Sequence, residues 1–428
     1  MKPVLQVALD FVDMSRAIKC AEEAVKGGAD WIEAGTPLIK SEGLDAVREL
    51  RKRFPKKTIV ADMKIMDAGR TEVEIAAKAG ADVVCVLGAA SDSTIKECVE
   101  AAHNYGAKIQ ADLIAVKNIK KRASQIEKLG VDYIGIHCAI DEQMQAKDAF
   151  GQLKEVSKNI KIPIAVAGGI NSETAPDAVR SGASIVIVGG AINKAKDAQK
   201  ATSDIKRSMV TLKKVKTDLF KRGSEKDIEK ILKKVSTANI SDAMHRSGEL
   251  KGLQPITPGV KIVGRALTVR TYPGDWAKTV QAVDAAEPGQ VIVIDAGGVG
   301  PAVWGELATH GAVQKKIAGV VIDGAIRDVV EIKKLGFPAF AKLVTPTAGE
   351  PKGFGEIGVP VTVGGTKVFS GDYIVADDDG VICIPAQKAA EVANRAMSVM
   401  EMENRLRGEI DKGSTLAKVV DLLKWEKQ

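Results

Sequence analysis

The chain has 428 residues, with 62 Lys and Arg against 55 Asp and Glu, and carries a formal net charge of +7. This length predicts two domains. No apolar run reaches membrane-spanning length and the N-terminus leads directly into a strand-like segment, so we expect neither a membrane protein nor a cleavable signal. The five cysteines lack CxxC spacing, which predicts reduced thiols in the cytoplasm.

The excess positive charge lies in one stretch. Residues 206–234 hold eleven basic and four acidic residues, a surplus of seven that equals the net charge of the whole chain. A basic run poor in aromatic residues is typical of a solvated helix and makes nucleic-acid binding unlikely. A helix stop and N-cap at Gly223-Ser224-Glu225 mark the domain change. We predict a first domain over 1–210, a basic helical linker over 211–234 and a second domain over 235–428.

Eight short apolar runs rich in β-branched residues divide the first domain, and each is bounded by Gly, Asp or Pro. Amphipathic stretches such as 15–26, 44–54, 72–79 and 93–104 lie between them, and Gly-Ala or Gly-Val pairs mark helix ends. Eight βα units in about 200 residues predict an α/β fold, a (β/α)8 TIM barrel. The runs are 4–9, 31–34, 58–61, 83–87, 108–113, 133–136, 162–167 and 185–188.

Polar residues follow the carboxyl ends of these predicted strands, where the chemistry of a TIM barrel is located. The most informative group is Asp62-Met63-Lys64-Ile65-Met66-Asp67, in which Asp62 and Lys64 share one strand face at period two. Alone, such a string is typical of an exposed ion pair, but its place in the barrel favours a pocket. The full set is Asp10, Glu33, Asp62, Lys64, Asp67, Asp112 and His137.

Glycine pairs follow the seventh and eighth strands, Gly168-Gly169 and Gly189-Gly190. Glycines there let backbone N–H groups approach a phosphate closely, and each pair precedes a helix start. The sequence therefore predicts a small phosphorylated substrate bound at these two turns.

Hard oxygen ligands and a titratable base complete the predicted site. Glu33 and Asp62 suit Mg²⁺ completed by water and substrate oxygens. Lys64 between carboxylates stays charged and can stabilise a developing oxyanion. His137 can act as an acid or base near neutral pH, although a lone histidine is more often structural.

Over residues 1–210 this pattern resembles the orotidine 5'-monophosphate decarboxylase suprafamily. Two of its groups compete, the 3-hexulose-6-phosphate synthases and the 3-keto-L-gulonate-6-phosphate decarboxylases. The decarboxylases carry an arginine shortly after the histidine, whereas this chain reads His137-Cys138-Ala139-Ile140-Asp141, which favours the synthases. Orotidine monophosphate decarboxylase itself fits less well because it is metal-free. A sugar-phosphate binding protein without turnover is the rival from another class.

The resemblance implies a reversible aldol reaction between formaldehyde and D-ribulose 5-phosphate. Glu33 and Asp62 would bind Mg²⁺, and Lys64 would contact the same substrate oxygens. His137 would take the proton from the attacking carbon or assist the formaldehyde oxygen, while Asp10 would hold sugar hydroxyls. In the family Asp67 reaches into the neighbouring subunit's site, so a homodimer is expected.

Longer β-runs characterise the second domain, with sparse helices at 236–246, 304–315 and 328–335 and again from 386 onward. These features predict an α+β domain with an extensive sheet. The predicted strands are 260–271, 290–295, 318–323, 339–344, 360–363, 367–369, 372–376 and 380–384.

Two clusters of this domain suggest chemistry, the glycine-rich 297–300 leading to Glu306, and the strand end at Arg327 and Asp328. An arginine beside a glycine-rich turn can bind a carboxylate, and Glu306 and Asp328 could flank a metal. Spacing alone equally fits a glycine-rich connection with a helix capped by Asp328.

Residues 235 to about 415 resemble the family that joins the regulator of ribonuclease activity A (RraA) to class II 4-hydroxy-4-methyl-2-oxoglutarate aldolases. The stretches Arg327-Asp328-x-x-Glu331 and Gly336-x-Pro338-x-Phe340-Ala341 follow its pattern. Glu306 stands at the place of a family acid that is separated from the arginine by twenty intervening positions. The resemblance implies a 2-oxo acid whose carboxylate Arg327 binds, Mg²⁺ held through water by Asp328, and a catalytic water positioned by Glu306. The alternative is a non-catalytic oligomerisation or regulatory module, since the family forms trimeric rings.

Overall fold

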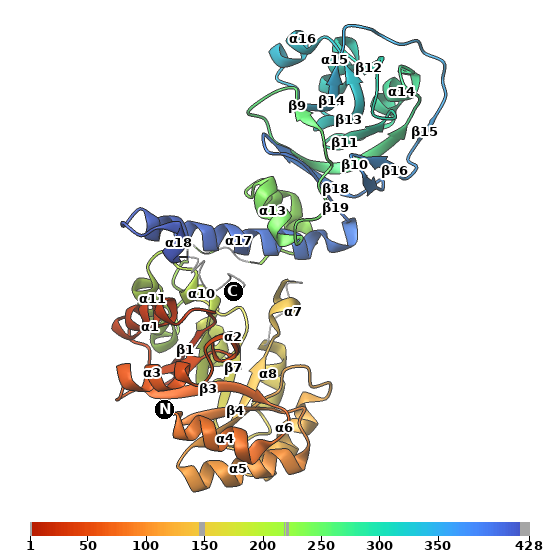
Figure 1. Ribbon diagram of the computed structural model, residues 1–428. Coiled ribbons are helices and arrows are strands. Elements are labelled where there is room, and N and C mark those ends of the chain that lie inside the picture. The colour runs from red at the N-terminus through yellow and green to blue at the C-terminus, as the bar shows by residue number, and fades with distance from the viewer. Residues whose placement is uncertain (1, 145–149, 218, 220–221, 420–428) are drawn as a thin grey trace. The chain divides into compact units, whose positions relative to one another are not determined.

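A computed structural model of the chain describes residues 2–144, 150–217, 219 and 222–419 (Figure 1). The chain divides into two compact units, residues 1–221 together with 401–428, and residues 222–400. Predicted linker residues 218, 220 and 221, and residues 420–428 of the predicted second domain, lie outside the described residues.

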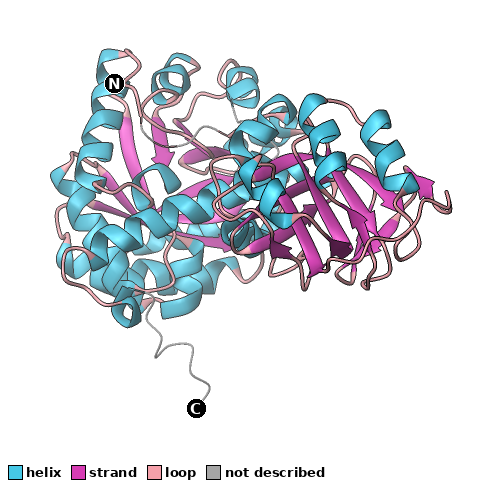
Figure 2. Ribbon diagram, turned by 90° about the horizontal axis from the view of Figure 1, so that it is seen from above, coloured by secondary structure: helices cyan, strands magenta, loops and turns pink. Residues whose placement is uncertain are grey.

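In the described residues of the first unit, eight parallel strands close into a barrel in sequence order, which confirms the predicted fold. Helices surround these strands (Figure 2). The strands are β1 (Val4–Leu9), β2 (Trp31–Ala34), β3 (Thr58–Ile65), β4 (Val83–Leu87), β5 (Lys108–Asp112), β6 (Tyr133–His137), β7 (Ile164–Ala167) and β8 (Ile185–Val188). Strand β3 is longer than predicted, and its register with β4 shifts between Ala61 and Ile65.

The helices of the barrel begin where side chains cap free backbone N–H groups. Asp13, Ser91 and Asp197 accept from the N–H three residues on, at the starts of α1, α5 and α11. The helices are α1 (Met14–Lys26), α2 (Thr36–Glu42), α3 (Asp45–Arg53), α4 (Gly69–Lys78), α5 (Asp92–Tyr105), α6 (Ile119–Lys128), α7 (Ile140–Met144), α8 (Phe150–Val156), α9 (Ala175–Arg180), α10 (Gly190–Asn193) and α11 (Ala198–Thr211).

The barrel core has two layers. Outward-facing strand residues such as Leu5, Ile59 and Val84 pack against the helices. Inward-facing residues fill the barrel, where Trp31 and Tyr133 meet edge-to-face with ring centroids 5.5 Å apart. Because side chains fill the interior, substrate chemistry is confined to the open end of the strands.

The prediction of a helical linker over 211–234 is wrong for its first part. Helix α11 ends at Thr211, and residues 212–217 carry no helix. Instead, Val215 and Ser172 exchange hydrogen bonds of 3.1 and 2.8 Å, and Thr217 N–H donates to Glu173. A short run with three lysines has no apolar face to bury as a helix, so contacts with the loop after β7 determine its conformation. Further along, η1 (Glu225–Asp227) and α12 (Ile228–Leu232) are helical.

The second unit is built on a mixed sheet, nine-stranded in the residues described, with path order β19-β18-β10-β11-β13-β14-β9. Strands β10, β11, β13 and β14 are parallel, and β18, β19 and β9 run antiparallel to their neighbours. The strands are β9 (Gln254–Pro255), β10 (Ile262–Arg270), β11 (Val291–Asp295), β12 (Ala302–Trp304), β13 (Gly319–Ile326), β14 (Ala339–Val344), β15 (Glu356–Ile357), β16 (Val361–Val363), β17 (Thr366–Val368), β18 (Tyr373–Asp377) and β19 (Gly380–Ile384).

Both faces of this sheet are covered. Ile292, Ile294 and Ile322 lie in one hydrophobic cluster, and Val291, Val293 and Val321 lie in the other, as alternation along a strand requires. The predicted helix over 304–315 begins two residues later, because Trp304 ends β12. The helices are α13 (Thr237–Ala243), α14 (Ala277–Ala285), α15 (Glu306–Gln314), α16 (Val329–Lys334), η2 (Ala386–Lys388), α17 (Ala389–Ile410) and α18 (Leu416–Val419).

The end of the chain differs from the predicted second domain over 235–428, because residues 401–428 group with the barrel. The five cysteines are buried and form no disulfide, in line with the predicted thiols. Among the described residues, no helix combines the length and apolar character that crossing a membrane requires.

Candidate active site

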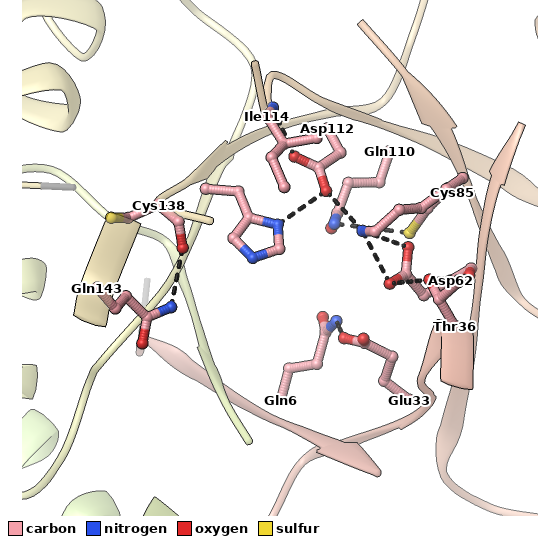
Figure 3. A network of polar contacts seen from close by, with 12 residues as sticks. Gln6, Glu33, Thr36, Asp62, Cys85, Gln110, Asp112, Ile114, Cys138 and Gln143 are labelled. Atoms are coloured by element: carbon pink, nitrogen blue, oxygen red, sulfur yellow. Dashed lines mark hydrogen bonds and ion pairs between the residues drawn. The ribbon is translucent and has the colours of Figure 1, made fainter. Parts of the chain in front are cut away.

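A lysine lies between two aspartates at the ends of the barrel strands, and Figure 3 shows the network of polar contacts to which Asp62 and Asp112 belong. Lys64 Nζ lies 2.9 Å from Asp112 Oδ2 and 3.0 Å from Asp62 Oδ2. Burial opposes the charge of Lys64, but the two carboxylates outweigh it and raise the pKa of the ammonium group. The backbone of Lys64 is left-handed, with φ of +48°, a conformation that costs energy for a side chain of this kind. The two carboxylates therefore hold the ammonium group of Lys64 in place and favour its charged form.

Asp112, at the end of β5, links this lysine to the histidine on the neighbouring strand. Its Oδ2 atom also lies 2.9 Å from His137 Nδ1, and its Oδ1 accepts from the N–H of Ile114. Burial raises the pKa of Asp112, but the hydrogen bonds and charges of His137 and Lys64 lower it by a larger amount. The resulting pKa is about 2. The carboxylate stays ionised and orients the imidazole, so that Nε2 is the ring nitrogen left to meet a substrate.

Glu33 on β2 occupies the most acidic part of the mouth. Gln6 Nε2 donates to Glu33 Oε2 at 2.5 Å, and both side chains are buried. Burial first, and then the charges of Asp62 and Asp10, raise the pKa of Glu33 well above its usual value. Thr36 Oγ donates to Asp62 at 2.8 Å. Ionisation of these neighbouring carboxyl groups is therefore opposed by burial and by their mutual repulsion, and a bound cation would relieve both.

The carboxylates at the mouth suit a Mg²⁺ ion that is completed by water and substrate oxygens. In the part of the chain that the structure describes, no three acidic, histidine or cysteine side chains converge as a metal-binding group. Mg²⁺ commonly keeps several waters and binds through one or two carboxylates plus substrate oxygens. Glu33 and Asp62 provide such a pair of carboxylates.

Asp10 and the predicted phosphate turns lie around the same mouth. The solvent-exposed Asp10 stands so close to Gly35 and Gly189 that an added Cβ would lie 2.4 and 2.7 Å from its carboxylate oxygens. Gly168 and Gly169 have φ of +111° and +70°, where glycine is favoured. Gly190 begins α10 directly after Gly189. Backbone geometry at both turns therefore depends on glycine, as a close approach to phosphate requires.

Asp67 lies apart from this network. It follows the end of β3, is exposed, and accepts a hydrogen bond of 2.8 Å from the N–H of Ala68. Met66 beside it is 54% exposed. Its predicted role in a neighbouring subunit's site stays a prediction.

In the second unit the three predicted residues come together. Arg327 Nε lies 3.4 Å from Asp328 Oδ2, and the same oxygen accepts from the backbone N–H of Glu306 at 3.1 Å. Asp328 is left-handed, with φ of +58°, and a Cβ on Gly305 would lie 2.5 Å from its carboxylate. The ends of β12 and β13 thus place an acid beside an arginine in a strained turn.

The Glu306 carboxylate points to a different partner. Its Oε1 lies 3.4 Å from Nε2 of His310, one turn further along α15. The sequence did not identify His310, although the i,i+4 spacing on a helix is a sufficient signal for such a pair. An acid, an arginine and a histidine are therefore available at this edge.

Comparison with known proteins identifies the first half. Residues 3–205 match the family model described as Orotidine 5'-phosphate decarboxylase / HUMPS family. The 3-hexulose-6-phosphate synthase of Bacillus subtilis (strain 168) is 43% identical over 207 residues, 48% of this chain and 98% of that protein. The barrel belongs to the 3-hexulose-6-phosphate synthase family. Membership makes the chain an enzyme of the aldehyde-lyase class. The crystal structure of 3-hexulose-6-phosphate synthase from Salmonella typhimurium, 35% identical, covers 50% of this chain and 100% of that one, with a TM-score of 0.48.

The second half matches a different family. Residues 237–383 match the family model described as RraA-like, Aldolase/RraA. The structure of the RNA-processing inhibitor RraA from Thermus thermophilis, 30% identical, covers 35% of this chain and 92% of that one, with a TM-score of 0.33. On the family-model matches, the chain is a fusion of a synthase-family barrel with an RraA-like domain.

Sequence reasoning missed several residues of the synthase barrel. Asp112 was placed at the mouth without a role, yet it connects Lys64 and His137. Gln6 faces Glu33 from inside the barrel, and Gln110 Nε2 donates to Cys85 Sγ at 3.7 Å. A glutamine inside an apolar strand is the signal that could have found both, because buried polar groups require partners.

Proposed function

We propose that the barrel catalyses the reversible, Mg²⁺-dependent aldol reaction between formaldehyde and D-ribulose 5-phosphate. The observation that carries this proposal is the chain of contacts from Asp62 through Lys64 and Asp112 to His137. It supplies a positive charge and a base next to one another, at the same end of the barrel strands as Glu33. The relatives named 3-hexulose-6-phosphate synthase support the substrate assignment, and a reaction on such metabolites fits a cytoplasmic protein.

Each residue has a distinct task in this proposal. His137 Nε2 takes a proton from C1 of the bound ketose, and Asp112 stabilises the imidazolium that forms. Lys64 donates to the oxygen on which negative charge develops. The electron pair left on C1 forms the bond to the formaldehyde carbon, whose oxygen takes up a proton.

Glu33 and Asp62 would hold Mg²⁺, which when bound lowers the energy of negative charge on neighbouring oxygens. Asp10 contacts sugar hydroxyls, and the turns at Gly168-Gly169 and Gly189-Gly190 bind the phosphate through backbone N–H groups. The residues at these turns set where C1 lies relative to His137.

The test is formaldehyde-dependent consumption of ribulose 5-phosphate by the full chain, with Mg²⁺ and with chelator. Product formation that stops with chelator and resumes when Mg²⁺ is added supports both the aldol reaction and its dependence on Mg²⁺. Release of CO₂ from 3-keto-L-gulonate 6-phosphate, without formaldehyde turnover, would instead assign the decarboxylase activity.

For the RraA-like domain we propose a Mg²⁺-dependent lyase that acts on a 2-oxo acid through a pyruvate enolate. Arg327 would bind the substrate carboxylate, Asp328 would hold Mg²⁺, and Glu306 would position a water. With oxaloacetate, the bond to the departing carboxylate breaks, CO₂ leaves, and the enolate takes a proton to give pyruvate. The contacts around Asp328 support this role over that of an ordinary helix cap.

Pyruvate release from oxaloacetate, measured with Mg²⁺ and with chelator, separates this lyase from a non-catalytic module. Asp328→Asn is expected to abolish metal-dependent release. Glu391→Gln is the matched control, because Glu391 lies on α17, outside the motif, and pairs with Arg395 at 2.9 Å. Absence of turnover by the wild-type domain at high enzyme concentration supports the oligomerisation or regulatory module.

A further inference from the structure

A buried arginine near the end of the chain contacts the barrel. Arg405 lies on α17, in the part that groups with the first unit, and is only 5% exposed. Its Nη1 donates to the carbonyl oxygens of Ala195 at 3.0 Å and Ile192 at 3.4 Å. Its Nε donates to Glu409 at 3.2 Å, and Nη2 lies 3.7 Å from Glu23 on α1. A buried charge is tolerated when it is paired in this way.

The two carbonyl groups belong to the end of α10 and the residues just after it. This helix begins at Gly190, directly after the turn that follows β8. Carbonyl groups at a helix end lack partners within the helix, and an arginine can satisfy them. Arg405 therefore fixes the far end of the short helix whose near end forms the predicted phosphate turn.

Hydrogen bonds connect that far end to the mouth of the barrel. The N–H groups of Ile192 and Asn193 donate to Gly189 O at 2.9 and 3.0 Å. Asn193 Nδ2 donates to Ala8 O on β1 at 2.9 Å, two residues before Asp10. Gly189 itself lies directly against the Asp10 carboxylate. A displacement of α10 therefore displaces both the phosphate turn and the residue predicted to hold sugar hydroxyls.

This contact is an addition to the family's barrel. The aligned 207 residues span 98% of the Bacillus subtilis relative, and the family model ends at residue 205. That relative therefore has no counterpart of residues 401–410. In this chain a segment that follows the second domain contacts the back of the phosphate turn.

We propose that Arg405 is a positioning residue for binding of the substrate phosphate, acting through α10 and the Gly189-Gly190 turn. The proposal rests on the proposed function of the barrel. Arg405 does not touch the reacting atoms, so it affects substrate affinity more than the chemical step.

The experiment compares Arg405→Met, Arg405→Lys and Arg407→Met in the full chain. Arg407 is the matched control, because it lies two residues further along α17 and its side chain is 61% exposed. We measure KM for ribulose 5-phosphate and kcat at saturating formaldehyde, and the Kd of inorganic phosphate by calorimetry. Glu409→Gln, which keeps the guanidinium but removes its Nε partner, replaces Arg405→Met if that variant does not fold.

We expect Arg405→Met to raise KM and the phosphate Kd by about tenfold, with kcat changed by less than about twofold. Arg405→Lys is expected to give an intermediate KM and Arg407→Met a wild-type value. Unchanged KM and phosphate Kd in Arg405→Met, even with a lower Tm, would overturn the proposal, because the residue would then be structural only. If the wild type lacks formaldehyde turnover but binds phosphate, the proposed function fails while the phosphate Kd still tests Arg405.

Discussion

At the level of single residues, the barrel site depends on one carboxylate that serves two partners. Asp112 Oδ2 lies 2.9 Å from both Lys64 Nζ and His137 Nδ1. Its negative charge keeps the lysine in place and selects the histidine tautomer with a proton on Nδ1. Because the lysine and the histidine share this oxygen atom, a change at the carboxylate affects both side chains.

Asp112→Asn is therefore expected to reduce kcat strongly, by about 10²- to 10⁴-fold. The amide cannot stabilise the imidazolium and pairs poorly with Lys64. Affinity for Mg²⁺ should change little, because the proposed ligands Glu33 and Asp62 remain. Steady-state kinetics over a Mg²⁺ titration measure both quantities.

Asp92→Asn is the control for the loss of one carboxylate. Asp92 begins α5, is 56% exposed in its side chain and pairs with Arg122 at 2.5 Å. Its kinetics should match those of the wild type. If Asp112→Asn retains kcat within a few-fold, His137 does not depend on this carboxylate.

The lowered pKa of Asp112 also predicts how stability depends on pH. Its value of about 2 in the folded state lies below the ordinary aspartate value of 3.8. The folded state therefore gains stability from this group above about pH 4 and loses it as the pH falls toward 2, on the order of 2 kcal/mol. Urea unfolding between pH 5.5 and 3.5 should show a shallower loss of stability for Asp112→Asn than for the wild type. Parallel curves for the two proteins would contradict the assignment.

At the level of elements, the sequence predicted the barrel strands because each is a short apolar run ended by a polar or glycine residue. Four of the eight have the predicted bounds. Helix α14 was missed because Trp276 at its start provides no side-chain cap, and its short sequence, with three alanines among its nine residues, gives little periodicity. The remaining differences between predicted and observed elements arise from contacts between residues far apart in the sequence. Local secondary-structure propensity does not specify such contacts, for example which carbonyl groups a distant arginine will bind.

The turn after β7 provides a test at this level. An added Cβ at Gly168 would lie 2.6 Å from the Cys138 carbonyl oxygen, and φ there is +111°. Gly168→Ala should destabilise the barrel by about 1–3 kcal/mol and raise KM for ribulose 5-phosphate, since the turn must move.

Gly151→Ala is the matched substitution, because an added Cβ there meets no atom within 4 Å and the residue lies within helix α8. It should be neutral or stabilise by about 0.5–1 kcal/mol. Urea unfolding and KM measurements on both variants separate backbone strain from the mere presence of a methyl group. Equal behaviour of the two variants would show that the Gly168 turn is adaptable.

At the level of the whole molecule, the predicted role of Asp67 is to reach into the active site of a second copy of the chain. Each barrel site would then be shared between two copies. A mixture of Asp62→Asn and Asp67→Asn chains, each inactive alone, should recover about one quarter of wild-type activity after subunit exchange. A mixed dimer holds one site with an intact Asp62 and an intact Asp67 from its partner. Native mass spectrometry confirms the exchange, and exchange without recovery would exclude a shared site.

The division of the chain has a consequence for its synthesis. The first unit comprises residues 1–221 and 401–428, so the RraA-like part is inserted within it. A ribosome needs about 10–40 s to add residues 222–400 at ordinary rates of elongation. During that interval the nascent barrel lacks Arg405. The carbonyl groups of Ile192 and Ala195 therefore lack the hydrogen bonds that Arg405 donates. An early stop between residues 222 and 404 would therefore release a barrel without this contact, so the first unit is whole only after Arg405 has been added.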